Sequence, residues 1–401
     1  MKTPLIVGGL LHFVILIASA VTPRVLDWRT NLATLHPFLR RLFWVYGGFI
    51  VLVIISFGTL TLLRVDELAA AAPLARSVCA MIAMFWLARL TVQFFVFDAR
   101  PFLTTTFRRV GYHGLTVLFS ALVPVLRAKG YETLVIGRRG TDLEWNGQTL
   151  GDWASALEGA EAVVNLTGKN INCRHTGENR REIIRSRVDS VRVLGEAIAR
   201  CAVPPKVFVQ ASGVGYYGDT GDCVADEDSP PGHDFPAEVC RQWEGAFDAL
   251  NLPATRKGIL RLGVVLGRDG GALPMLEKLT RWFLGGAVGN GKQFISWIHV
   301  ADVVRMFEAA VEQTDLSGVF NSTSPRPVTN KEFMRELRRA LHRPWSPPVP
   351  APFARAGAWL MGTDGELALT STRCVPRRFV QHGFDFQFPN LRDALASLYS
   401  I

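Results

Sequence analysis

The stretch FSALVPVLRAKGYETLVIGRR, Phe119 to Arg139, decides the fold of this chain. Its pattern predicts a short helix, then an apolar strand at Thr133–Ile136, then two arginines. A nucleotide-binding α/β unit places its first helix, its second strand and the residues that contact the ribose in this order. The preceding segment HGLTVLF, His113 to Phe119, holds one glycine where such a unit has a glycine-rich turn. The stretch therefore predicts a nucleotide-binding fold whose phosphate turn is missing or replaced.

Composition divides the 401-residue chain into an apolar N-terminal part and an α/β part of ordinary polarity. The formal net charge is +9, and many of the arginines flank apolar segments. We interpret this charge as a signal of membrane orientation, because no basic stripe interleaved with aromatic residues indicates a nucleic-acid partner. The six cysteines form no Cys-x-x-Cys pair and no His/Cys metal spacing, which is typical of free thiols in a reducing compartment. The sequence predicts no metal site.

Three segments have the length that a membrane-spanning helix needs, about 17–25 apolar residues. They are Pro4–Val21, Leu42–Leu63 and Leu74–Phe97. The first also resembles a signal peptide, since Lys2 precedes it and an Ala-Ser-Ala sequence lies near its end. We favour an uncleaved span, because further apolar segments follow. The sequence thus predicts a multi-span membrane domain at residues 1–119, which would anchor the protein and offer a surface for a homo-oligomer or another partner in the lipid bilayer.

The arginines predict how these spans are oriented. The connection between the second and third spans carries only Arg64 and Arg76, beside Asp66 and Glu67. By the positive-inside rule, the N-terminus lies outside and the C-terminal part lies in the cytoplasm. We therefore expect a multi-pass protein of the bacterial inner membrane with a cytoplasmic C-terminal domain. The other arginines follow the first and third spans: Arg24, Arg29, Arg40, Arg41, Arg100, Arg108 and Arg109.

The run Val110–Leu126 leaves an alternative open. As a fourth span it would export the C-terminal part, and Arg127 and Lys129 would then face outside, against the rule. The run is short for a span and contains His113 and Pro124. We favour three spans over four.

Short apolar strands alternate with helical stretches from about Ser120 onward, which predicts a mostly parallel sheet. The proline-rich run Arg343–Pro352 is predicted to be a linker, since it suits neither a helix nor a central strand. The fold class is an α-helical membrane domain, a Rossmann-like parallel-sheet domain at 120–342 with its first strand absent or displaced, and a small helical C-terminal subdomain at 343–401. The predicted elements are strands at Thr133–Ile136, Ala162–Leu166, Lys206–Gln210 and Gly258–Val265, and helices at Glu178–Arg200 and Ala237–Leu250.

Polar and glycine residues follow three of these strands, where open α/β sheets bind ligands. The stretches are VVNLTGKNI, ASGVGYYGD and RLGVVLGRDGGAL. Together with RSRVDSVRVL, DFPAEVCRQWE, GGAVGNGKQFISWIHVADVV, FNSTSPRPVTNKEF and QHGFDFQFPNLRDAL, they resemble the atypical extended short-chain dehydrogenase/reductases. These are NAD-dependent epimerase/dehydratase-like proteins with a small C-terminal domain of unknown function. The resemblance runs from roughly Ser120 to the C-terminus.

The resemblance implies an NADP(H) cofactor and a small carbonyl or hydroxyl substrate. Arg138 and Arg139 match the position that meets the ribose 2′-phosphate, a ligand that suits arginine. The alternative is that both arginines reinforce membrane orientation. The loop beside the cofactor riboses is matched by the turn Asn165, Leu166, Thr167 and Gly168.

Catalytic residues are implied as well. Ser212 matches the strand-end serine that holds the substrate beside the cofactor, and a local backbone contact is its alternative role. Most of the superfamily uses a Tyr-x-x-x-Lys pair for proton transfer, but Phe235 and Val239 stand in those positions here. Tyr216 or Tyr217 would then supply the acid, and packing against the pocket wall is the alternative for both.

The stretch SWIHVAD contributes one more titratable group. His299 lies near the expected substrate side and titrates in a useful range. Asp302 is expected to cap a helix and to fix the adjacent loop.

The missing glycine turn is the second departure from the family pattern. Backbone must approach the pyrophosphate there, and Phe119 in place of the last glycine would block this approach. The cofactor site is therefore expected to be incomplete. Three hypotheses remain: a membrane-tethered NAD(P)-dependent oxidoreductase or epimerase, a non-catalytic module that binds a ligand or partner, and a fusion product that lost its first strand and folds poorly.

Overall fold

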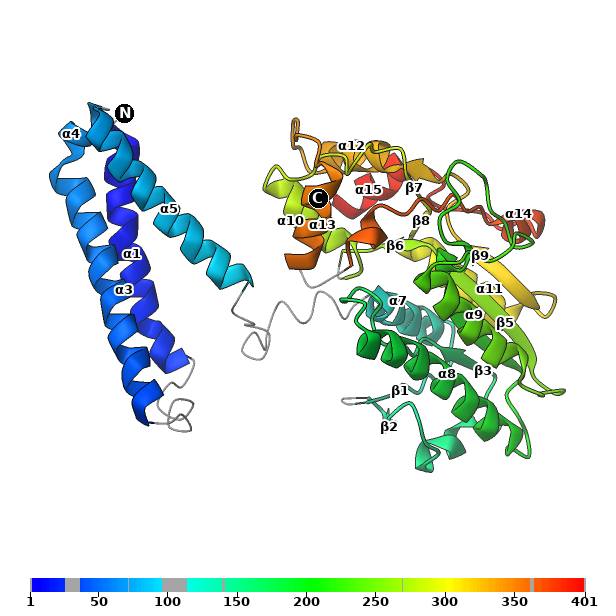
Figure 1. The fold of residues 1–401 in the computed structure, drawn as a ribbon. Coiled ribbons are helices and arrows are strands. Elements are labelled where there is room, and N and C mark those ends of the chain that lie inside the picture. Colours follow the sequence, from blue (N-terminus) through cyan, green and yellow to red (C-terminus); the bar gives the residue numbers. More distant parts are fainter. Residues whose placement is uncertain are drawn as a thin grey trace. The chain divides into compact units, whose positions relative to one another are not determined.

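The computed structural model describes residues 2–25, 37–70, 72–95, 114–138, 141–268, 270–360 and 364–399. The chain divides into two compact units, Met1–Thr104 and Thr105–Ile401, each of which is described by itself (Figure 1).

The N-terminal unit is helical and consists of α1 (Lys2–Val25), α3 (Pro37–Leu63), α4 (Val65–Ala69) and α5 (Pro73–Phe95). Helices α1 and α3 pack closely, because glycines lie at their contact. A Cβ at Gly9 would lie 2.7 Å from Leu62, and a Cβ at Gly58 would lie 2.8 Å from Phe13. Helix α5 joins them through a hydrogen bond from Trp86 Nε1 to His12 Nε2 of 2.9 Å.

Within the described residues, one segment is long and apolar enough to cross a membrane, Trp44–Leu63 with a mean hydropathy of 2.1. Two shorter apolar segments, Leu5–Leu16 and Pro73–Trp86, lie in α1 and α5. Among the described residues, one segment therefore passes as long and apolar enough to span, where the sequence predicted three.

The C-terminal unit is built on a parallel sheet in the order β3-β4-β5-β9. Strand β4 is buried along almost its whole length, as expected for a strand covered on both faces. Helix α8 packs beside α9, and α7 beside α11 (Figure 1). The Rossmann-like class predicted from the sequence is confirmed. The bounds are β3 Ala162–Asn165, β4 Val207–Gly213, β5 Arg256–Leu262, β9 Gly318–Ser322, α7 Gly114–Ala128, α8 Gly177–Ala199, α9 Phe235–Asp248 and α11 Val300–Glu312.

A separate two-stranded ladder precedes this sheet. It pairs β1 (Ile136–Gly137) with β2 (Leu143–Glu144) in parallel. Among the described residues, no strand pairs with the outer edge of β3, which is where the first strand of a Rossmann sheet would lie. The strand predicted at Thr133–Ile136 overlaps β1 at Ile136 alone.

Helix α7 includes the residues just before Ser120, where the glycine-rich turn of the family was expected. It is helical from Gly114 onward, and Leu122 is buried in the core of the C-terminal unit. Lys129, just after the helix, donates a 3.1 Å hydrogen bond to Glu312 of α11. A helix docked in this way belongs to the C-terminal unit, and the choice between three and four spans stays a prediction. The boundary predicted at residue 119 falls inside this helix.

A second core lies around Trp297, Phe333 and Leu395, and β6, β8, β10, α10, α12 and α15 contribute to it. The linker predicted at Arg343–Pro352 ends earlier, because Pro352 lies in the first turn of α13, where proline is tolerated. The remaining elements are η1 Asp152–Leu157, η2 Val214–Tyr217, β6 Val264–Leu266, β7 Phe294–Ile295, β8 Trp297–His299, β10 Val328–Thr329, α10 Leu273–Arg281, α12 Asn330–Ala340, α13 Ala351–Leu360, η3 Gly365–Ala368, α14 Arg377–Gln381 and α15 Leu391–Tyr399.

Candidate active site

The parallel register places three polar side chains in one row at the carboxyl ends of the strands. Ser212 of β4 is paired with Arg261 of β5, and Arg261 is paired with Asn321 of β9. Residues in register on neighbouring strands point to the same face of a sheet. The row lies at the edge where open α/β sheets bind their ligands.

A buried ion pair holds this row to helix α9. The guanidinium of Arg261 donates from Nε to Glu244 Oε1 at 2.9 Å and from Nη2 to Glu244 Oε2 at 2.6 Å. Ser212 Oγ donates to Glu244 Oε1 at 2.6 Å. Burial alone would lower the pKa of Arg261, but the hydrogen bonds and charge of Glu244 raise it above its ordinary value. The proton of the predicted catalytic serine is thus directed at Glu244.

The two predicted tyrosines lie in different environments. Tyr217 is buried, and its hydroxyl donates to Asn321 Oδ1 at 2.7 Å and accepts from Arg261 Nη1 at 2.9 Å. Burial raises the pKa of Tyr217. The half-buried ring of Tyr216 stacks on the guanidinium, with 3.4 Å from Arg261 Cζ to the ring centroid. Tyr217 is therefore part of the internal network, and Tyr216 is the more accessible phenol.

The turn after β3 is shaped by the side chain of Asn165. This side chain is buried, donates to Gln210 Oε1 at 2.9 Å and accepts from the backbone N–H of Thr167 at 3.0 Å. The amide of Asn165 therefore positions the turn from within. Leu166, Thr167 and Gly168 are half-buried along it.

Helix α8 supports the same turn through Arg187, a residue that was not singled out from the sequence although it lies in the quoted motif RSRVDSVRVL. Arg187 Nη1 donates to Lys169 O at 2.8 Å and to Ile183 O at 3.0 Å, and the guanidinium lies 4.9 Å from the Trp243 ring. Burial lowers the pKa of Arg187 to about 10. A Cβ at Gly168 would lie 3.0 Å from Arg187 Cζ, so glycine permits this close contact.

The positions of the missing Tyr-x-x-x-Lys pair lie at the start of α9. Asp234 caps this helix by accepting from the backbone N–H of Ala237 at 2.9 Å. Phe235 packs against His175, with ring centroids 4.8 Å apart, and Val239 is buried. His175, also not predicted from the sequence, pairs with Asp364 at 3.2 Å.

The predicted catalytic residue His299 lies at the start of α11. Its ring caps α11 by accepting from the backbone N–H of Ala301 at 3.1 Å, and its other nitrogen lies 3.3 Å from Ser397 Oγ. Burial lowers the pKa of His299 to about 4, so the ring is neutral near pH 7. The predicted cap, Asp302, instead accepts from the backbone of Gln387 and Phe388 and so fixes the C-terminal segment.

The predicted cofactor residues at the second strand are described in part. Arg138 is exposed directly after β1, at the carboxyl end expected for a residue that contacts the ribose. Arg139 lies outside the described residues. Residues that could contact the two ends of a dinucleotide thus lie after β1 and β3. Among the described residues, no such site is found for the pyrophosphate between them, because residues 114–119 are helical where the glycine-rich turn would be.

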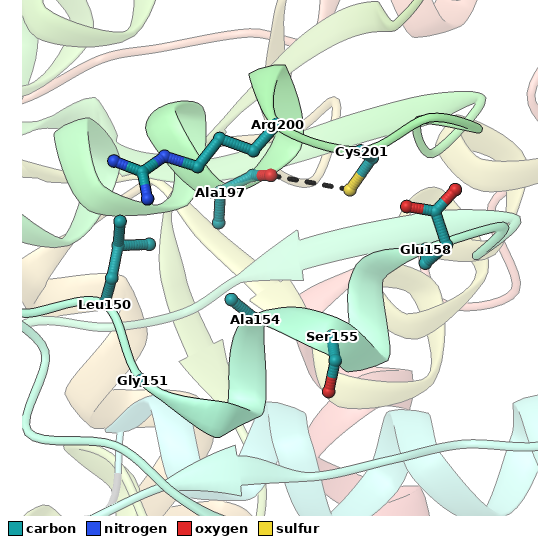
Figure 2. Close-up of a pocket in the computed structure, with 8 residues that line it drawn as sticks. All are labelled: Leu150, Gly151, Ala154, Ser155, Glu158, Ala197, Arg200 and Cys201. Carbon is teal, nitrogen blue, oxygen red and sulfur yellow. Dashed lines mark hydrogen bonds between the residues drawn. The ribbon is translucent and has the colours of Figure 1, made fainter.

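A surface pocket of about 250 Å³ lies elsewhere, between η1 and the end of α8 (Figure 2). Its residues include Ala154, Glu158, Arg200 and Cys201, which lie shortly before β3 and β4 begin. The pocket is therefore at the amino-terminal edge of the sheet, away from the row of Ser212. Among the described residues, no three His, Cys, Asp or Glu side chains gather in a group that could hold a metal ion.

The fold and the polar strand ends define a Rossmann-type α/β protein of the short-chain dehydrogenase/reductase kind. The chain belongs to the NAD dependent epimerase/dehydratase family, whose sequence model matches residues 118–321. A domain of unknown function, DUF1731, matches residues 349–398.

Relatives match the same part of the chain. The epimerase family protein ML0860 of Mycobacterium leprae is 36% identical over 69% of this chain and 91% of its own length. The chloroplastic SDR39U1 homolog of Arabidopsis thaliana is 38% identical over 62% of this chain and 71% of its own length. The crystal structure of human epimerase family protein SDR39U1 with NADPH superposes with a TM-score of 0.65, at 33% identity, over 70% of this chain and 95% of that one.

Proposed function

We propose that this protein is a membrane-tethered NADP(H)-dependent oxidoreductase or epimerase that acts on a small carbonyl or hydroxyl compound. The observation that carries the proposal is the row of Ser212 and Arg261 at the ligand-binding edge of the sheet, with Tyr216 stacked on Arg261. The human relative, whose crystal structure contains NADPH, supports the choice of cofactor.

In this proposal the nicotinamide cofactor supplies the hydride chemistry. Arg138 and Arg139 bind the 2′-phosphate, a group that favours arginine. Tyr216 donates and accepts the proton at the substrate oxygen, because it is the more accessible of the two phenols. The stacked guanidinium of Arg261 sets a positive charge beside its ring, as lysine does in a Tyr-x-x-x-Lys pair, and Glu244 fixes this stacking and partly balances the charge.

A second function has its own support. The helical start of α7 at Gly114, together with Phe235 and Val239, favours a non-catalytic module that binds a ligand or partner through the same fold. Such a module would retain the turn after β3 but would not bind a pyrophosphate.

The tether is proposed from the apolar N-terminal unit. We place this unit in the bacterial inner membrane, with Trp44–Leu63 as one span and with α1 and α5, which are 24 and 23 residues long, as two more. The C-terminal unit then lies in the cytoplasm, as the arginine distribution favours. A homo-oligomer formed through this unit is part of the proposal.

Cofactor titration tests the proposal. NADPH fluorescence is measured while the full chain in detergent is added, and NADH is titrated in parallel. We expect micromolar NADPH binding and weaker NADH binding. Arg138→Gln should weaken NADPH binding about tenfold or more, because it removes a charge-assisted phosphate contact. Arg200→Gln, at the opposite edge of the sheet, should not.

Two results would contradict the proposed enzymatic function. The absence of NADPH binding, or equal affinity for NADPH and NADH that Arg138→Gln leaves unchanged, would favour the binding module. If binding then appears when a glycine-rich turn is introduced before Ser120, the replaced turn is the cause.

A further inference from the structure

Four large apolar side chains are exposed near the end of α10. The exposed fractions are 73% for Trp282, 48% for Phe283, 55% for Leu284 and 68% for Trp345. Single exposed apolar residues are ordinary on protein surfaces, whereas contiguous ones mark contact surfaces. Three of the four residues are aromatic, and we call the group the aromatic patch.

The patch is contiguous because two segments lie side by side. The guanidinium of Arg343, two residues before Trp345, lies 5.4 Å from the Phe283 ring. Arg338 Nη1 donates to Gly285 O at 2.6 Å, and Arg343 N donates to Arg338 O at 2.8 Å. The backbone of Gly286 touches Pro347 so closely that a Cβ would lie 1.7 Å from Pro347 O. The turn at 282–286 is thereby fixed against the run at 343–348.

The backbone at Phe283 is strained. Its φ is +61°, in the left-handed region that side chains rarely adopt. Phe283 N bonds Thr280 O and Leu284 N bonds Leu279 O, which is the pattern of a helix end whose left-handed residue is usually glycine. A phenylalanine here costs about 1 kcal/mol or more in stability. The chain thus keeps an exposed aromatic ring where glycine would be more stable.

Basic residues surround the patch. Lys278 and Arg281 lie in the last turn of α10, and Arg338 and Arg339 lie in the last turn of α12. The carboxylates nearest in these helices, Glu277 and Glu336, pair with Arg281 and Arg339. With Arg343 added, positive charge is in excess around the exposed rings.

We infer that the aromatic patch docks on an anionic lipid surface. Tryptophan and phenylalanine insert at the level of lipid headgroups, and flanking cations attract anionic lipids with about 1 kcal/mol each. A membrane is favoured over a protein partner because the same chain carries a helix of membrane-spanning length. This contact rests on the proposed membrane tether but requires neither the cofactor nor the reaction.

The test uses the full chain in nanodiscs of phosphatidylcholine, with or without phosphatidylglycerol. A fluorescent amino acid that reports polarity is placed at position 345, or at Val203 as an exposed control near the amino-terminal edge of the sheet. We expect brominated lipids to quench the probe at 345 but not the one at 203. The quenching should increase with phosphatidylglycerol.

Phe283→Gly separates docking from folding. This substitution should shift the urea midpoint of unfolding upward, because it relieves the strain. It should also reduce quenching at position 345. A structural role for the ring predicts a loss of stability instead.

Two outcomes overturn the inference. Equal quenching at 345 and 203 in both lipid mixtures would show that the patch does not face the bilayer. A probe signal that follows protein concentration and ignores lipid composition would assign the patch to a second copy of the chain. If the chain fails to enter nanodiscs, the proposed tether fails, and sedimentation with anionic vesicles tests the patch independently.

Discussion

Tyr216 and Tyr217 are neighbours in the sequence, yet their hydroxyl groups have different surroundings. Tyr217 is buried, and its hydroxyl is bonded to both Asn321 and Arg261. Tyr216 contributes the face of its ring to the same guanidinium and is only half-buried. Consecutive residues in η2 therefore divide into a structural group and an accessible one.

This difference predicts opposite effects of removing each hydroxyl. Tyr217→Phe should lower the free energy of unfolding by about 1–3 kcal/mol, because it leaves buried partners unsatisfied. Tyr216→Phe should change it by less than about 0.5 kcal/mol, because the ring stack is retained. The measurement is urea unfolding of the full chain in detergent, followed by tryptophan fluorescence. Equal effects of the two substitutions would contradict the assignment.

The sequence placed these residues at the carboxyl end of a strand but did not distinguish their roles. It identified Ser212 and both tyrosines from the family pattern of a strand end. It did not identify Glu244 or Arg261 as their partners, because a buried ion pair between a strand and a helix has no signal in local spacing. The sequence also contained no sign that His299 caps α11, because the contacts of a side chain are not visible in local spacing.

Helix α9 and strand β5 are joined by Glu244 and Arg261, whose charges are both buried. Removing one partner leaves the other charge uncompensated away from water, which costs about 3–5 kcal/mol. Removing both replaces an ion pair with apolar packing, which is often close to neutral.

A double-mutant cycle tests this connection. Glu244→Leu and Arg261→Met should each destabilise the C-terminal unit by about 3–5 kcal/mol, and the double variant by clearly less than the sum. Unfolding in urea gives the three values under the same conditions. Additive effects would show that the two side chains are not coupled and that β5 and α9 are held together by apolar packing alone.

The elements differ in how well the sequence predicted them. Helices α8 and α9 were expected at Glu178–Arg200 and Ala237–Leu250, within two residues of the observed bounds, because long amphipathic patterns are informative. Thr176 and Asp234 cap them as expected for helix starts. Strands β7, β8 and β10 were not predicted, since two or three residues carry no measurable periodicity. Helix α7 was anticipated in part, but not its start at Gly114.

At the scale of the whole chain, the family match begins at residue 118, inside α7. Helix α7 belongs to the C-terminal unit through Leu122 and Lys129, so the family fold keeps its first helix. What departs from the family is the segment before it, where the sequence has no glycine turn. The sequence predicted this departure because the turn requires glycine at fixed positions, and the absence of glycine is visible in the sequence itself.

The orientation of the chain in a membrane is the prediction that belongs to this scale. In the N-terminal unit, Lys2 pairs with Asp66 at 2.5 Å, which sets the start of α1 beside the connection after α3. Both would lie outside under the positive-inside rule, with the arginine-rich connection and the C-terminal unit in the cytoplasm. With three spans, an exported C-terminal unit would require a fourth, and the segment that the sequence offers for it overlaps α7, which packs in the C-terminal unit.

Reporter fusions to the C-terminus of the full chain test this orientation in bacterial cells. We expect a green fluorescent protein fusion to fluoresce and an alkaline phosphatase fusion to be inactive, because the phosphatase requires the oxidising periplasm. Replacing Arg24, Arg29, Arg40 and Arg41 with glutamine should give a mixed orientation, since it removes the bias that holds the first connection inside. An equal number of Arg→Gln changes on the exposed face of the C-terminal unit serves as the control. Phosphatase activity of the unaltered fusion would reverse the proposed orientation and, with it, the assignment of the catalytic domain to the compartment that holds NADPH.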